Sequence, residues 1–166
     1  MASTYEPIAT QTLGSSAASV TFSSIPSTYT DLILVTNEKQ TGSRASAMQF
    51  NSDTGSNYSM TEMYGDGSST GSTRLSNYAR IYYAYDVFAD TSNFGLNTVT
   101  HFLNYANTST YKTIITRASN RNGGGTSAMV GLWRSTAAIS TIYLYLDNLS
   151  NYAAGSTFTL YGIKAA

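Results

Sequence analysis

The sequence is short of the residues that build most chemical sites. It contains no cysteine and a single histidine among 166 residues. Without cysteine the chain forms no disulfide and offers no thiolate to a metal or a substrate. One histidine cannot supply the ligand shell of a zinc ion, in which histidine and cysteine dominate. Disulfide scaffolds and thiol enzymes are therefore excluded, and zinc proteins nearly so.

Charge is also scarce. Only 11% of the residues are charged, whereas soluble domains average roughly 25%. Nine Lys and Arg balance nine Asp and Glu, which gives a formal net charge of zero. No basic face is expected that could neutralise a run of phosphates, so nucleic acid is not an expected partner. Polarity comes instead from 24 Ser, 24 Thr and 12 Asn.

Long apolar runs are missing as well. The longest, from Leu32 to Val35, falls far short of the roughly 18 residues that a membrane helix needs. The N-terminus lacks the basic and apolar regions of a secretory signal, so we expect neither a membrane partner nor export by that route. Even so, 42% hydrophobic residues, including 14 Tyr and 6 Phe, suffice for a packed core. The length predicts one domain, residues 1–166.

Strand-forming residues cluster in short segments. Val, Ile, Thr, Tyr and Phe favour strands because branched and aromatic side chains pack well on a pleated surface. No window keeps a helical apolar period with start and stop signals, so at most one short helix is expected. Strands at short spacing without helices between them predict an all-β fold, an antiparallel β-sandwich that is jelly-roll-like with about ten strands. The predicted strands are Ile8–Leu13, Ser19–Ser23, Asp31–Thr36, Ala45–Asn51, Arg80–Phe88, Thr98–Tyr105, Lys112–Ser119, Ser127–Trp133, Ser140–Leu146 and Thr157–Ile163.

The stretch from Ser52 to Ser76 departs from this pattern. It is rich in Ser, Thr and Gly, and Gly65-Asp66-Gly67 inside it is typical of a turn. Its few apolar residues include Met60, Met63, Tyr64 and Leu75. We predict a long exposed loop over residues 52–76.

One motif has the form of a catalytic site. Asp53-Thr54-Gly55-Ser56 matches the motif of the aspartic proteases, in which two carboxylates share one proton. The protease Asp sits at a strand end among apolar residues, whereas here Asn51 and Ser52 precede it. We interpret the motif as a turn.

The remaining candidates for chemistry are isolated. His101 has no Gly-x-Ser-x-Gly elbow to accompany it, and its alternating apolar segment predicts a partly buried, satisfied ring. Asp53, Glu62 and Asp66 could supply oxygens to an irregular cation site, but the alternate acidic positions of a calcium-binding loop are missing. The Gly-rich stretch Asn122–Gly125 lacks the lysine of a phosphate-binding loop. We therefore predict no cofactor, no metal and no catalytic residue, and expect that the protein is not an enzyme.

Tyrosine is the most informative residue type. Its rigid ring and single hydroxyl make adaptable contacts at low entropic cost, especially among Ser, Thr, Asn and Gly. A binding surface and ordinary core positions are equally compatible with this composition. Tyr143 and Tyr145 share one face of a predicted strand, whereas Trp133, as the one tryptophan, is also a natural core anchor. The candidate interaction surface comprises Tyr58, Tyr64, Asp66, Tyr78, Tyr143, Tyr145 and Trp133.

Several stretches carry more than composition. They are residues 3–26 (STYEPIATQTLGSSAASVTFSSIP), 50–58 (FNSDTGSNY), 131–134 (GLWR) and 158–166 (FTLYGIKAA). Together they resemble the opening, the middle and the closing strand of a family of tailed-bacteriophage virion proteins frequent in cyanophages and marine phages. The resemblance spans nearly the whole chain and implies a virion context. No catalytic residues come with it.

Two functions follow from the resemblance and the composition. The first is a capsid decoration or cement protein, made in the host cytoplasm and located in the virion, expected as a homotrimer that also contacts the major capsid protein or a tail protein. The alternative is a receptor-binding module of a tail or head fibre. In that case the 52–76 loop and the turn at Asn122 would present Tyr58, Tyr64, Asp66 and Tyr78 to a host-surface carbohydrate.

Overall fold

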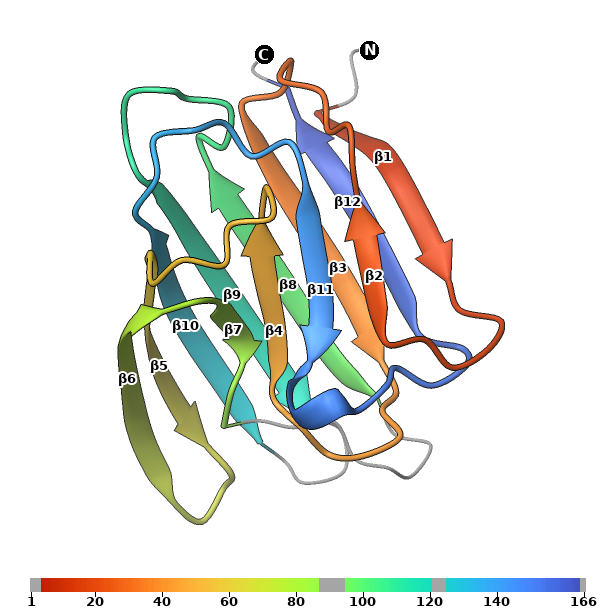
Figure 1. Ribbon diagram of the computed structural model, residues 1–166. Coiled ribbons are helices and arrows are strands. Elements are labelled where there is room, and N and C mark those ends of the chain that lie inside the picture. Colours follow the sequence, from red (N-terminus) through yellow and green to blue (C-terminus); the bar gives the residue numbers. More distant parts are fainter. Residues whose placement is uncertain (1–3, 87–94, 121–124, 165–166) are drawn as a thin grey trace.

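Two stacked sheets make up the protein (Figure 1). The computed structural model describes residues 4–86, 95–120 and 125–164, and all statements below concern these ranges. They contain twelve strands and a single 3-10 turn at Asp147–Leu149. Every strand pairing is antiparallel. The predicted all-β sandwich is therefore confirmed.

The two sheets differ in size. The larger has eight strands in the order β1-β12-β3-β8-β9-β10-β5-β6, and the smaller has four in the order β2-β11-β4-β7. The larger sheet comprises β1 (Tyr5–Thr12), β12 (Thr157–Ile163), β3 (Asp31–Glu38), β8 (Leu96–Leu103), β9 (Lys112–Asn120), β10 (Thr126–Trp133), β5 (Tyr58–Gly65) and β6 (Thr70–Tyr78). The smaller comprises β2 (Ser19–Phe22), β11 (Ile142–Leu146), β4 (Ser46–Phe50) and β7 (Ile81–Ala84).

All ten predicted strands are present, with bounds that differ by a few residues. The segment predicted from Arg80 to Phe88 is a strand only over Ile81–Ala84, and Phe88 lies outside the described residues. Asn122, in the predicted Gly-rich turn, also lies outside them. Alternation is a reliable guide here because one face of most of these strands packs against the other sheet.

The long exposed loop predicted at 52–76 is wrong. Most of that stretch is the hairpin of β5 and β6, which pair from Tyr58↔Tyr78 to Gly65↔Thr70. The hydrophobic signal is weak because Glu62 occupies an inward position of β5, between Met60 and Tyr64. β6 is an edge strand, so backbone pairing on one side holds it with few apolar side chains.

An aromatic cluster fills one end of the core. Phe50, the last residue of β4, packs edge-on against Phe102 of the larger sheet, with ring centroids 5.8 Å apart. Trp133 lies 5.4 Å from Phe50 and stacks on Tyr58 at 6.3 Å. These contacts join β4 to β8, β10 and β5, so they link the two sheets.

A polar cluster occupies the other end of β4. Glu38 is fully buried and accepts hydrogen bonds from Ser46, the first residue of β4, at 2.7 Å and from Tyr83 at 2.6 Å. The Thr36 hydroxyl donates to the same carboxylate at 2.9 Å, and the Tyr83 hydroxyl is 3.0 Å from that of Tyr152. Burial raises the pKa of Glu38 despite these donors. Both carboxylate oxygens are satisfied, as a buried polar group requires.

The C-terminal strand lies inside the larger sheet. β12 pairs with β1 on one side and with β3 on the other. The ring of Tyr29 lies so close to Gly162 that a Cβ atom there would be 2.3 Å from it. Glycine is therefore needed at this position of the closing strand, and the pairing of β1 depends on β12.

Candidate functional site

The structure separates the seven residues of the predicted interaction surface into three groups. Two are not on the surface: Trp133 is 2% exposed and Tyr58 is fully buried. Their assignment to an interaction surface is corrected. They belong to the core because β5 and β10 pair in register, which places Tyr58 beside Trp133 beneath the smaller sheet.

The Asp53 motif holds these two aromatic residues in place. Its carboxylate accepts a hydrogen bond from the Trp133 indole N–H at 2.7 Å, and its backbone carbonyl accepts one from the Tyr58 hydroxyl at 2.9 Å. The Gly55 N–H and the Asn57 amide also donate to the carboxylate. Partial burial raises the pKa of Asp53, but these donors outweigh burial and the net pKa lies below 3.8. The predicted turn is confirmed, and its carboxylate is engaged in structural contacts.

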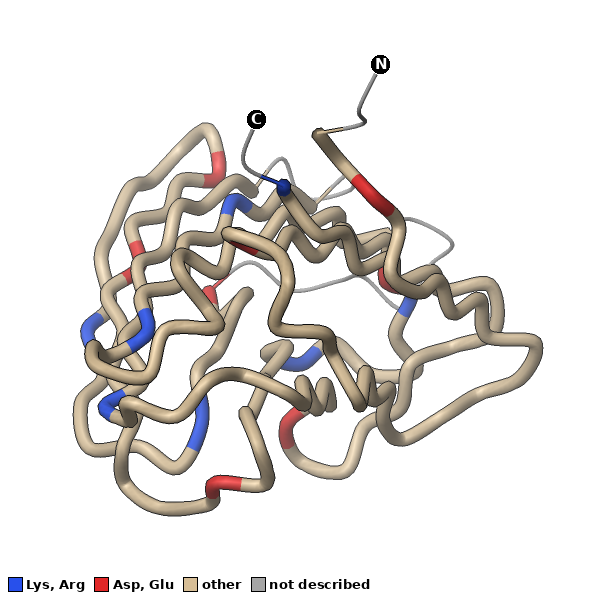
Figure 2. Tube along the Cα trace, turned by 90° about the horizontal axis from the view of Figure 1, so that it is seen from above, with Lys and Arg blue, Asp and Glu red and all other residues tan. Residues whose placement is uncertain are grey.

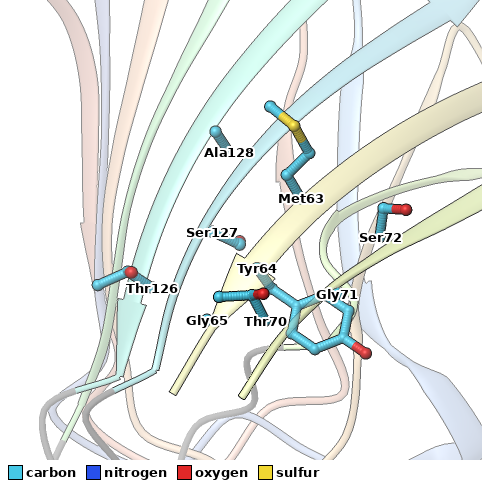
Figure 3. Close-up of a pocket in the computed structure, with 9 residues that line it drawn as sticks. All are labelled: Met63, Tyr64, Gly65, Thr70, Gly71, Ser72, Thr126, Ser127 and Ala128. Atoms are coloured by element: carbon cyan, nitrogen blue, oxygen red, sulfur yellow. The ribbon is translucent and has the colours of Figure 1, made fainter. Parts of the chain in front are cut away.

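A second group, Tyr64 and Asp66, lies at the tip of the β5–β6 hairpin. Figure 3 shows Tyr64 among the residues that line a hollow there. The Tyr64 ring lies across Gly71, where a Cβ atom would be 2.6 Å from the ring. Asp66 accepts hydrogen bonds from the backbone N–H groups of Ser69 and Ser68, which lower its pKa and close the hairpin turn. Beside them is an open hollow of about 720 Å³.

The third group gathers on the outer face of the smaller sheet. The rings of Tyr143 and Tyr145 in β11 stack at 5.2 Å. The ring centroid of Tyr82 lies 6.3 Å from that of Tyr78 and 4.8 Å from that of Tyr85. We call these five residues the tyrosine face. Tyr82 and Tyr85 were not among the predicted site residues. The alternation of Tyr82 with Ile81 and Tyr83 could have indicated Tyr82. It gave no signal for Tyr85, which has the same parity as Tyr83 and lies beyond the end of β7.

Arg80 connects the two halves of the tyrosine face. Its guanidinium lies over the rings of Tyr145, at 5.7 Å, and Tyr82, at 5.8 Å. It also pairs with Asp147, which accepts a hydrogen bond from the Tyr82 hydroxyl at 2.7 Å. Burial and this hydrogen bond raise the pKa of Tyr82. Pattern reasoning missed Arg80 and Asp147, because the contacts of Asp147 with Arg80 and Tyr82 join residues 65 or more positions apart.

The outer face of the larger sheet was not predicted as a surface of interest. Four of its aliphatic side chains are strongly exposed, from 39% to 64%: Val35, Ile115, Val130 and Met63. Register places Val130 beside Ile115, Ile115 beside His101, and His101 beside Ile33 in one cross-strand row. Val35, Val99, Arg117, Ala128 and Met63 form the next row.

This aliphatic face has a polar margin. The row nearest the β8 N-terminus carries Asn37, Asn97, Ser119 and Thr126. Among the described residues, the smaller sheet lies only on the opposite, inner side of these strands. Large aliphatic side chains in adjacent rows that no second layer covers are typical of an interaction surface.

The remaining candidates for chemistry stay apart. His101 is partly buried with its Nε2 3.2 Å from an oxygen of Asp31, as predicted for a satisfied ring. Glu62 points into the sandwich while Asp53 and Asp66 close separate turns, so these three do not form the irregular cation site. Within the described ranges, no three His, Cys, Asp or Glu side chains could hold a metal ion together.

Charged residues are dispersed along the described chain (Figure 2). No helix in these ranges has the length and apolar character of a membrane span. Comparison with protein-family models and with curated proteins found no match.

Proposed function

We propose that the protein is a structural protein on the surface of a tailed-phage particle, where it decorates and stabilises the shell by packing against copies of itself and neighbouring virion proteins. The observation that carries the proposal is the aliphatic outer face of the larger sheet. Val130 and Ile115, side by side in register, are 54% and 40% exposed. A two-layer fold leaves that face to a neighbouring molecule.

Burial of this face would provide the energy of association. Apolar area removed from water contributes about 25 cal/mol per Å² before the cost of association. A standard protein interface buries about 800 Å² per partner. Met63, 64% exposed, stands beside the hollow at the hairpin tip, so the face offers both a protruding side chain and a recess.

Copies of the same chain suit this face. The formal net charge is zero, so like molecules do not repel one another over long distances. The exposed aliphatic rows carry few charges, chiefly Arg117 and Arg74. The expected number of copies is three, and the resemblance to tailed-phage virion proteins supports the particle context.

We also infer a jelly roll with an inserted hairpin. Eight strands, β2 to β8 and β11, form the order first-eighth-third-sixth in the smaller sheet, which is the jelly-roll order. In the larger sheet the second and seventh (β3, β8) and the fourth and fifth (β5, β6) are separated by the β9–β10 hairpin. This connectivity is common in viral capsid domains, which supports the proposed role.

The first experiment is to measure the oligomeric state by light scattering. We expect the wild-type chain to associate, and Val130→Lys to shift it to monomer without changing the melting temperature. Ser119→Lys is the matched control, because it adds the same charge to the neighbouring strand on the same face but in the polar margin, away from the hollow. A monomeric wild type, or equal effects of both substitutions, would contradict self-association through this face.

The second experiment tests the particle. Quantitative mass spectrometry of purified phage particles should find hundreds of copies of this chain for a capsid decoration role. A few to a few dozen copies would place it in the tail or at vertices instead, and its absence would overturn the virion proposal.

The alternative function, recognition of a host-surface carbohydrate, is not supported by the positions of the four residues predicted for it. It relied on a 52–76 loop presenting Tyr58, Tyr64, Tyr78 and Asp66, but Tyr58 is buried. Tyr64 and Asp66 lie at the hairpin tip, whereas Tyr78 contacts Tyr82 of the smaller sheet. Carbohydrate recognition by these four residues together is therefore not proposed.

A further inference from the structure

A hollow of about 370 Å³ lies on the outer face of the smaller sheet. This volume falls in the lower part of the range of small-molecule sites, roughly 300–1,000 Å³. One ring, one amide and four hydroxyls line it, from Tyr143, Gln49, Thr21, Thr141, Ser52 and Thr54. None of these side chains is charged, so the hollow offers no counter-ion to an anionic or cationic ligand.

An aromatic stack ends at this hollow. One side of Tyr145 faces the Arg80 guanidinium at 5.7 Å, and Tyr145 stacks with Tyr143 at 5.2 Å and an interplanar angle of 30°. Thr141, two residues before Tyr143 and on the same face of the strand, lines the hollow, whereas Tyr145 does not. The hollow therefore lies on the side of Tyr143 away from Tyr145, where another ring can continue the stack.

The polar wall is held in one conformation. Asn51 and Ser52 both have positive φ angles, 51° and 59°, in the turn that follows β4. The Asn51 carboxamide oxygen accepts hydrogen bonds from the N–H groups of Ser140, at 2.9 Å, and Thr141, at 3.0 Å. Such backbone conformations are costly for residues other than glycine and are common where a ligand is held.

The lining hydroxyls are available to a ligand. Within the described ranges, no hydrogen bond occupies the side-chain hydroxyl of Thr21, Ser52, Thr54 or Thr141. The Gln49 amide donates to the carbonyl of Ala79 at 2.8 Å, which fixes the orientation of its carboxamide. Hydroxyls that both donate and accept, beside a flat apolar ring, match a ligand with many hydroxyls and an apolar C–H face.

We propose that this hollow binds a neutral saccharide, with one sugar ring stacked on the free side of Tyr143 and its hydroxyls bonded to the polar wall. The site is on the face opposite to the proposed assembly surface. It does not depend on the virion role, and self-association can fail while saccharide binding holds.

The test is calorimetric titration of the full chain with a panel of neutral oligosaccharides of glucose, mannose, galactose and N-acetylglucosamine. We expect at least one to bind, with Tyr143→Ala weakening the affinity by about tenfold, which corresponds to about 1.4 kcal/mol. Tyr143→Phe keeps the ring and should stay within about twofold of wild type. Tyr161→Ala is the matched control, because Tyr161 is a half-buried strand tyrosine of the larger sheet.

A second, milder variant tests the site in case Tyr143→Ala disturbs folding. Thr141→Val removes one lining hydroxyl but keeps a β-branched side chain of similar shape, so it should weaken binding while the melting temperature stays unchanged. The proposal is overturned if no neutral oligosaccharide binds at concentrations up to about 10 mM. A dissociation constant of that size corresponds to a binding free energy of only about 2.7 kcal/mol in magnitude. Equal binding by wild type, Tyr143→Ala and Thr141→Val, or binding of sulfated and sialylated glycans alone, also overturns it.

Discussion

Two carboxylates at opposite ends of the core each hold aromatic side chains, yet their environments differ. Asp53 is partly exposed and accepts from the Trp133 indole, and its donors lower its pKa. Glu38 is fully buried and accepts from the Tyr83 hydroxyl, and burial raises its pKa. The two carboxylates accept similar hydrogen bonds, but their contributions to folding stability depend on pH in opposite directions. The reason is that removing the charge from water costs more at the fully buried Glu38.

This difference in pKa sets the pH range in which each carboxylate stabilises the sandwich. A carboxylate with a lowered pKa contributes stability above its ordinary value and loses it as the pH falls. A carboxylate with a raised pKa contributes most below its ordinary value, and that contribution is lost as the pH rises. Asp53 thus stabilises the fold most above its ordinary pKa, whereas Glu38 stabilises it most at low pH.

The largest effect is expected where the aromatic end is removed altogether. Trp133→Ala deletes the ring that contacts Phe50 and Tyr58, and leaves the carboxylate of Asp53 without its shortest donor. We expect a loss of about 3–5 kcal/mol in the free energy of unfolding, measured by urea denaturation. Tyr111→Ala, which truncates a side chain that is 54% exposed, is the control and should cost less than about 0.5 kcal/mol. A similar loss in both variants would show that the aromatic end is not special.

A smaller effect is expected from Asp53→Asn. Loss of the charged acceptor should cost about 1–2 kcal/mol near neutral pH. Because the pKa of Asp53 is lowered, wild type loses this advantage as the pH falls through and below 3.8, and the two proteins should converge there. Denaturation curves from about pH 6 to about pH 2.5 measure the difference. A difference that is independent of pH would show that the carboxylate charge has no part in holding Trp133.

The smallest effect, and one of opposite sign, is expected from Glu38→Gln. The amide stays neutral at every pH, so at low pH it replaces the protonated acid at a cost within about 1 kcal/mol. As the pH rises above 4.5, Glu38 ionises in the unfolded chain but remains protonated in the fold, where burial raises its pKa. Wild type therefore loses stability as the pH rises, whereas the variant has no group there that titrates. The variant should therefore gain relative to wild type with increasing pH in the same denaturation series. A relative loss would mean that the buried ion is better stabilised by its three donors than by remaining neutral.

Much of the fold could be predicted because it follows from local alternation. Val20 and Phe22 in β2, and Ile142 and Leu144 in β11, face the core as their spacing of two residues indicates. The β5–β6 hairpin could not be predicted in this way. Glu62 at an inward position breaks the apolar pattern, and an edge strand needs little of it.

The candidate sites divide similarly. Tyr143 and Tyr145 were correctly placed on one face of a strand. The contact of Tyr145 with Arg80, however, involves the turn between β6 and β7, and the hollow beside Tyr143 involves β2, β4 and the turn after β4. Tyr58 and Trp133 have the same composition signal as the surface tyrosines and yet are buried. Pattern alone cannot separate these cases, since it says which residues share a face and not what covers that face.

The sequence by itself determined the class of this protein: a cysteine-free, weakly charged all-β fold with abundant tyrosine. Residue preferences and a period of two are local properties, so they need no knowledge of distant contacts. Only the tertiary structure decided which tyrosines are buried, which aliphatic face stays open and where the hollow lies. Those outcomes depend on how two sheets of unequal width stack, and that stacking joins residues far apart in the chain.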